Sequence, residues 1–134
     1  MELHLNIIGY TLLVLSFIHL AFPKKFNWKE EFKSVSLINK EMMYIHTFFI
    51  ALIILLNGML CIFCASDLIN TKLGKQISLG LFIFWCCRLL FQFIGYSSEL
   101  WKGKSFETLV HIIFTLFWTY LSLIFLMIYL GKSF

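Results

Sequence analysis

The sequence predicts an all-α integral membrane protein, a four-transmembrane-helix bundle with a short interfacial amphipathic helix between its first two spans. Of the 134 residues, 60% are hydrophobic and 19% are aromatic, a composition typical of membrane proteins. A helix needs ~20 apolar residues to cross a hydrocarbon core ~30 Å thick. Four stretches meet this length, at about residues 3–22, 42–65, 76–97 and 106–130. We expect one domain covering residues 1–134.

The first stretch resembles a signal peptide in hydrophobicity but has neither a basic start nor a small-residue cleavage site, so we expect a retained span. Pro23 is expected to end its helix. In the segment that follows, Trp28, Phe32 and Val35 fall on one side of a helix and charged residues fall on the others. This pattern favours a short amphipathic helix at the membrane interface; the alternative is a solvated loop anchored by Trp28.

Lysine distribution predicts the orientation. One side of the membrane would carry seven lysines and the other would carry three; the seven are Lys24, Lys25, Lys29, Lys33, Lys40, Lys102 and Lys104. Because lysine-rich loops stay in the cytoplasm, we expect cytoplasmic loops at residues 23–41 and 98–105, with both termini outside, in a bacterial inner membrane. The net charge of +4 indicates attraction to anionic membrane lipids. Nucleic acid is not an expected partner, because the basic residues flank spans.

The third stretch contains the only arginine, Arg88, on one helical face with other polar and aromatic residues; they are Trp85, Gln92, Tyr96 and Glu99. A charge inside a span costs ~3 kcal/mol, so Arg88 must face protein, water or a ligand. No acidic residue lies in the middle of a span. We therefore expect Arg88 to bind an anion, with Gln92, Tyr96 and Asn57 completing the pocket. Alternatively, Arg88 extends toward Glu99 or binds backbone carbonyls.

Three of the four histidines are predicted to lie at one depth. His19, His46 and His111 each fall three to five residues inside the cytoplasmic end of a different span, about 4–8 Å from that face at 1.5 Å per residue. Three imidazoles from separate helices suit zinc, iron or copper and leave a position open. Glu107, one turn before His111, would serve as a fourth ligand or orient that ring. Alternatively, each histidine simply binds a backbone carbonyl.

These residues lead to three functional hypotheses. In the first, the histidines bind a transition metal and Arg88 with Gln92 holds a lipid-like or anionic small molecule, which a metal-bound species hydrolyses or oxidises. In the second, two of the histidines hold haem b in an electron-transfer subunit serving quinone. In the third, the chain is a non-catalytic membrane subunit, a homo-oligomer or one component of a larger complex, and its polar stripes bond between helices. Whether the protein is an enzyme is left open.

The four cysteines carry a weaker signal. Cys61 and Cys64 have the C-x-x-C spacing of redox and metal sites, and Cys86 and Cys87 are adjacent in the third stretch. Neighbouring cysteines rarely form a useful disulfide, and Cys64 lies in the last turn of an apolar helix. Buried, inert thiols are therefore the favoured interpretation.

Overall fold

The computed structural model of the chain describes residues 1–132, apart from the side chain of Ser98. All regular structure in this range is helical, which confirms the predicted all-α fold class. Four helices are long: α1 (Glu2–Lys25), α3 (Leu37–Phe63), α5 (Lys72–Ile94) and α6 (Ser105–Leu130). Each is long and apolar enough to cross a membrane. The short elements are α2 (Trp28–Glu31), η1 (Phe32–Ser34), α4 (Ala65–Asn70) and η2 (Ser98–Leu100).

Two of the long helices begin before the apolar stretches from which their spans were predicted. Helix α3 begins at Leu37, five residues before the predicted span, and α5 begins at Lys72, four residues before it. The added residues include charged side chains, and they continue the backbone hydrogen bonds of each helix beyond its apolar stretch. Hydropathy therefore located the spans, whereas backbone bonding and capping set the helix ends.

The expectation that Pro23 ends α1 was wrong, because the helix continues to Lys25. Proline removes its own N–H donor and crowds the carbonyl four residues before it, but beyond Pro23 the N–H of Phe26 still donates to the carbonyl of Phe22 at 2.9 Å. The chain turns instead at Asn27, whose φ of 48° lies in the left-handed region. Asparagine tolerates that region better than most residues.

The connection after α1 contains the predicted short helix, as one α-helical turn followed by a 3₁₀ turn. The Trp28 ring lies 5.0 Å from that of Phe32 and 5.4 Å from that of Tyr44, measured between ring centroids. Lys29 and Lys33 are exposed, and Lys33 pairs with Glu30. The segment is thus amphipathic, with its aromatic side packed on the start of α3. Its place at a membrane interface stays a prediction.

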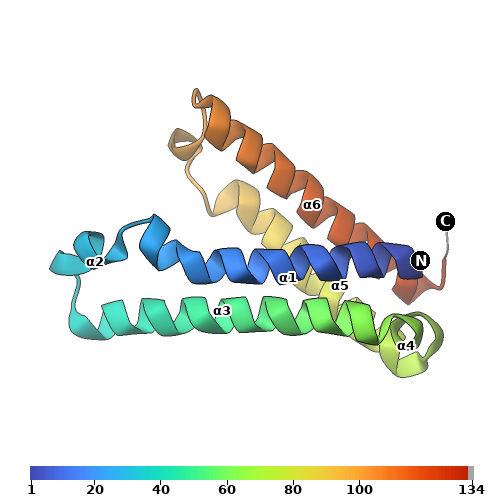
Figure 1. Ribbon diagram of the computed structural model, residues 1–134. Helices are drawn as coiled ribbons and strands as arrows, with labels where there is room; N and C mark the ends of the chain where they lie inside the picture. Colours follow the sequence, from blue (N-terminus) through green and yellow to red (C-terminus); the bar gives the residue numbers. More distant parts are fainter. Residues whose placement is uncertain (133–134) are drawn as a thin grey trace. The chain divides into compact units, whose positions relative to one another are not determined.

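The chain divides into two compact units, Leu5–Ala65 and a second formed by Met1–His4 with the residues from Ser66 onward. The first unit is a hairpin of α1 and α3, which lie side by side and antiparallel (Figure 1). A Cβ on Gly9 would lie 2.9 Å from the Gly58 carbonyl oxygen, and a Cβ on Gly58 would lie equally close to that of Gly9. The Ser16 hydroxyl donates to the Ala51 carbonyl at 2.9 Å. The two backbones are therefore in direct contact.

In the second unit, a tight turn joins α4 to α5. The Thr71 hydroxyl accepts from the Gly74 N–H at 2.8 Å and donates to the Asp67 carbonyl at 2.7 Å. A Cβ on Gly74 would overlap that same carbonyl oxygen. Only glycine fits here, because the two helices meet backbone to backbone.

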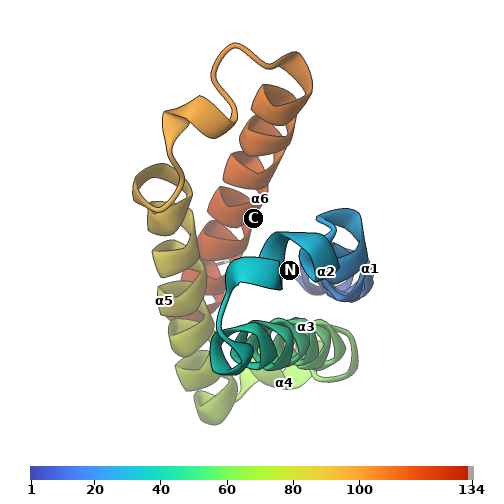
Figure 2. The same cartoon turned by 90° about the vertical axis from the view of Figure 1, so that its left-hand side faces the viewer.

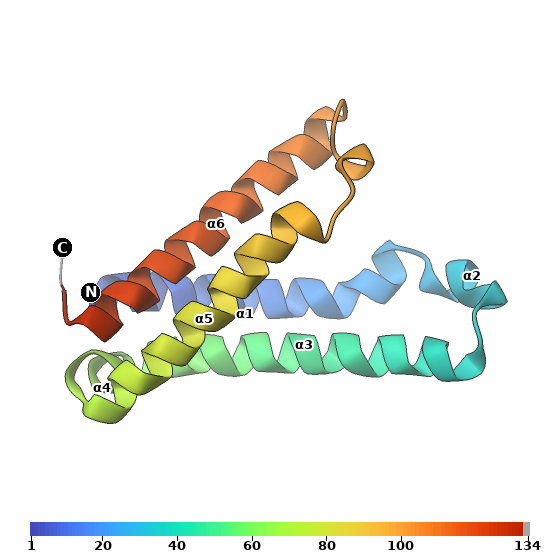
Figure 3. The same ribbon diagram turned by 180° about the vertical axis from the view of Figure 1, so that it is seen from behind.

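Helices α5 and α6 form the second hairpin, joined by the connection at residues 95–104 (Figure 2). They run antiparallel, side by side along their lengths (Figure 3). Two facing pairs define the register, Trp85 with Trp118 and Gln92 with His111. The pairs are seven residues apart on each helix, about 10.5 Å at the helical rise. Arg88 lies between them on α5. That all four spans form one domain stays a prediction.

Candidate functional site

A line of polar side chains crosses from α5 to α6. The Arg88 guanidinium donates through Nη1 to Oε1 of Gln92 at 3.2 Å, and Nε2 of Gln92 lies 3.0 Å from Nδ1 of His111. Arg88 and Gln92 are one turn apart, so both side chains share a face of α5. Gln92 is buried, while Arg88 and His111 are half-buried. The predicted pairing of Arg88 with Gln92 is thus present, and His111 extends it to the next helix.

Aromatic rings surround the guanidinium. Its Cζ atom lies 5.1 Å from the ring centroid of Trp118 and 5.8 Å from that of Tyr96, distances at which ring faces attract a cation. In residues 1–132, the one ion pair joins Lys33 and Glu30, so Arg88 pairs with no carboxylate there. A neutral amide and aromatic rings hold this cation, and none of them neutralises it.

The network also fixes the form of His111. Arginine can only donate, so Gln92 must turn its oxygen toward Arg88 and its NH₂ toward His111. Nδ1 of His111 then accepts, and the neutral ring carries its proton on Nε2. A metal bound at Nε2 would require that proton to move and the Gln92 amide to turn over. In this arrangement, His111 is a hydrogen-bond partner of Gln92.

The connection between α5 and α6 lies against His111. The Trp101 ring stacks on the imidazole with 4.4 Å between centroids and 10° between planes. The Thr108 hydroxyl donates to the Trp101 carbonyl at 2.6 Å, which ties the connection to the first turn of α6. Trp101 thus covers the end of the polar line that lies farthest from Arg88.

His19 and His46 lie in the other hairpin, and each bonds its own helix. Their Nδ1 atoms lie 2.9 Å and 2.8 Å from the carbonyl oxygens of Leu15 and Met42. Since a carbonyl only accepts, Nδ1 donates and Nε2 keeps a lone pair. His46 is exposed, because five residues before Ala51 rotate it about 140° from the contact with α1 at 3.6 residues per turn.

The described residues contain no group of three or more histidine, cysteine or acidic side chains placed to hold a metal ion. Glu107 is exposed in the first turn of α6, where a carboxylate also favours the helix dipole. Asn57 is buried on α3, in the unit without Arg88. The metal set of His19, His46 and His111, the role of Glu107 and the haem alternative all stay predictions.

Two buried hydrogen-bond donors beside Arg88 have no acceptor in the described part of the chain. They are the indole Nε1 atoms of Trp85 and Trp118, whose side chains are 1% and 3% exposed. The two rings stack at 5.1 Å with 9° between their planes. An unpaired buried donor costs about 1–3 kcal/mol, so a ligand that supplied acceptors to these two indoles would be stabilised. The sequence places Trp118 on one helical stripe with His111, but it did not indicate that Trp118 lies beside Arg88.

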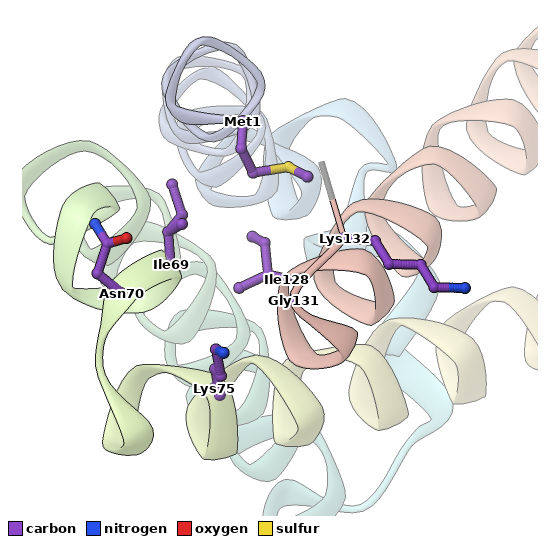
Figure 4. A pocket seen from close by; sticks show the side chains of 7 residues that line it. All are labelled: Met1, Ile69, Asn70, Lys75, Ile128, Gly131 and Lys132. Carbon is purple, nitrogen blue, oxygen red and sulfur yellow. The ribbon is translucent and has the colours of Figure 1, made fainter. Parts of the chain in front are cut away.

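A cavity of about 270 Å³ lies at the opposite end of the second hairpin (Figure 4). Lys75 extends toward its interior and Lys132 extends away from the other lining side chains. The remaining lining residues are Met1, Ile69, Asn70, Ile128 and Gly131. With one inward ammonium group and no orphaned donor among its lining residues, this cavity has weaker anion-binding chemistry than the Arg88 region.

The cysteines are free among the described residues. Cys61 is buried and Cys64 and Cys86 are half-buried, in line with inert thiols, but Cys87 is exposed. Its side chain points away from the face of α5 that carries Arg88, because one residue of helix is a rotation of about 100°.

No family model matches the chain, and neither the curated proteins nor the solved structures give a match.

Proposed function

We propose that this protein binds an anionic, lipid-like small molecule at Arg88. One observation carries the proposal: a guanidinium within a membrane-length helix bonds a neutral amide and pairs with no carboxylate in residues 1–132. An uncompensated charge in such a segment is costly, so an anion that pairs with it gains the energy of neutralisation. Carboxylates and phosphates fit best, because the planar guanidinium donates to two oxygens at once.

The position of Arg88 supports a ligand that already dissolves in the membrane. Arg88 lies six residues before the end of α5, about 9 Å inside the helix at 1.5 Å per residue. Phe91, one turn beyond Arg88, is an exposed apolar side chain, which suits an acyl tail. We further propose that this end faces the cytoplasm of a bacterial inner membrane, with both termini outside; the lysine bias of the loops supports that orientation.

The test is ligand-induced stabilisation of the chain purified in an uncharged detergent. Dodecyl phosphate or laurate at about 100 times its Kd should stabilise the protein by about 2.7 kcal/mol. Arg88→Gln should abolish that gain while leaving the unliganded protein at least as stable, because it removes an uncompensated charge. Lys102→Gln, which changes an exposed cation, should keep the gain. Equal stabilisation of wild type and Arg88→Gln would contradict the proposal.

In a second variant, the protein itself supplies a carboxylate to Arg88. Gln92→Glu would place a fixed acid beside Arg88 at the position that now accepts its 3.2 Å hydrogen bond. We expect affinity for the amphiphile to fall at least tenfold, while the unliganded protein folds normally. Retention of wild-type affinity would mean that Arg88 does not receive the ligand.

A transition-metal site is the second candidate function. His19 and His46 both donate from Nδ1 to a backbone carbonyl, which leaves Nε2 in the form that binds zinc, iron or copper. Hydrolysis or oxidation of the bound molecule would require this metal. Elemental analysis of tag-free protein tests it: stoichiometric metal lost in His19→Ala and His46→Ala would establish the site. A haem absorption band would favour electron transfer, and metal-free, colourless protein would leave anion binding alone.

A further inference from the structure

The two indole donors that lack an acceptor indicate which chemical group the ligand presents. Trp85 lies one turn before Arg88 on α5, and Trp118 lies across from it on α6 with its ring 5.1 Å from the guanidinium Cζ. Both indole N–H groups are buried and lack an acceptor in residues 1–132. Like arginine, indole can only donate. Three adjacent side chains therefore offer hydrogen bonds that this part of the chain does not accept.

We infer that the ligand's head is an oxyanion, a carboxylate or a phosphate, that accepts hydrogen bonds from Arg88 and from the indole N–H groups of Trp85 and Trp118. This inference rests on the proposed function and specifies what is bound. A quinone or another neutral carbonyl compound would accept a hydrogen bond from an indole but would not neutralise the charge of the guanidinium. An oxyanion satisfies both, because it carries charge and several acceptor sites on one small group.

The surroundings also exclude a cationic head. The face contains a fixed positive charge, and stacked rings 5.1 Å apart close it on one side. A hydrated inorganic anion would have to shed its water within a span, whereas an amphiphile reaches this depth through its tail. The ligand class is thus an amphiphile with an oxyanion head.

The experiment measures affinities by calorimetry on the full chain in uncharged detergent. The probes are dodecyl phosphate, laurate and inorganic phosphate, titrated into wild type, Trp85→Phe, Trp118→Phe, the double variant and Arg88→Gln. Phenylalanine keeps an aromatic ring but removes the N–H group. Each single variant should lose roughly tenfold in affinity, the size of one hydrogen bond to a charged acceptor. The matched control is Trp28→Phe, which removes an indole from the other hairpin and should change nothing.

Thermal unfolding without ligand separates recognition from packing. Trp→Phe removes an unpaired buried donor but also leaves a cavity where the larger ring was packed, so the unliganded Tm of both single variants should fall modestly, and the gain in Tm that the probe adds should fall as well. A Tm that falls equally with and without the probe would assign the indoles to packing alone and overturn the inference.

The remaining outcomes distinguish the two proposals. Binding that is lost in Arg88→Gln but unchanged in both tryptophan variants would overturn this inference and leave the proposed function intact. No binding of either amphiphile to wild type would remove the proposed function and this inference together. Inorganic phosphate binding as tightly as dodecyl phosphate would support the oxyanion and refute the lipid tail.

Discussion

The two hairpins use the same spacing with opposite kinds of residue. In α1 and α3, contacts seven residues apart join small residues, Gly9 to Gly58 and Ser16 to Ala51. In α5 and α6, contacts seven residues apart join large ones, Trp85 to Trp118 and Gln92 to His111. Small residues let backbones touch, whereas large side chains fill the space between helices. The second hairpin therefore has donors that remain unpaired, and the first has no room for a ligand at its contacts.

The largest expected effect comes from separating the backbones of the first hairpin. A side chain at Gly58 would meet the Gly9 carbonyl oxygen, which cannot move without its helix. Gly58→Leu should therefore destabilise the protein by about 3 kcal/mol, the upper end for overpacking, in thermal or denaturant unfolding in detergent. Gly80→Leu is the matched control, because a Cβ at Gly80 meets nothing within 4 Å. Equal losses in both variants would show that the close contact is not needed.

Breaking the polar line of the second hairpin should have a smaller effect. Gln92→Leu leaves Arg88 and Nδ1 of His111 each without the hydrogen bond that it makes now. We expect a loss of about 2 kcal/mol in the free energy of unfolding. Gln76→Leu, on the exposed surface of the same helix, should cost little. A stable Gln92→Leu variant would mean that the aromatic stack alone joins α5 to α6.

Two buried serines allow a hydrogen bond between helices to be compared with a hydrogen bond within one helix. The Ser16 hydroxyl bonds across to Ala51, whereas the buried Ser122 hydroxyl bonds the Trp118 carbonyl of its own helix at 2.8 Å. Ser16→Ala should cost about 0.6 kcal/mol, the average for such bonds in membrane proteins. Ser122→Ala should lie closer to zero, since its removal breaks no link between helices. The same unfolding measurement decides, and the reverse order would contradict this difference between the hairpins.

The smallest effect is expected at His46. Its ring is exposed and bonds only its own helix, so His46→Ala should change unfolding by less than about 0.5 kcal/mol. His111→Ala should cost more, because it removes both the Gln92 bond and the Trp101 stack. A large loss at His46, together with loss of bound metal, would instead support the metal site.

The sequence predicted the four spans and the polar face of α5 because both depend on local properties. Hydropathy over about 20 residues locates a span, and a spacing of four residues places Arg88 beside Gln92 whatever the neighbouring helix does. Helix ends were less predictable: α1 passes Pro23 and turns at Asn27. A single missing N–H does not end a helix whose remaining bonds persist.

Sequence alone determined that a lone arginine sits in a membrane-length helix without an acidic residue near the middle of any span. Tertiary structure decided which side chains surround it, namely Trp118 from α6 and Gln92 with its hydrogen bond to His111. It also decided that the His46 ring hydrogen-bonds its own helix. The contacts around Arg88 depend on the register and rotation of one helix against another. Periodicity along a single helix cannot supply them, because glycine contacts in one hairpin and a tryptophan stack in the other set how the helices pack.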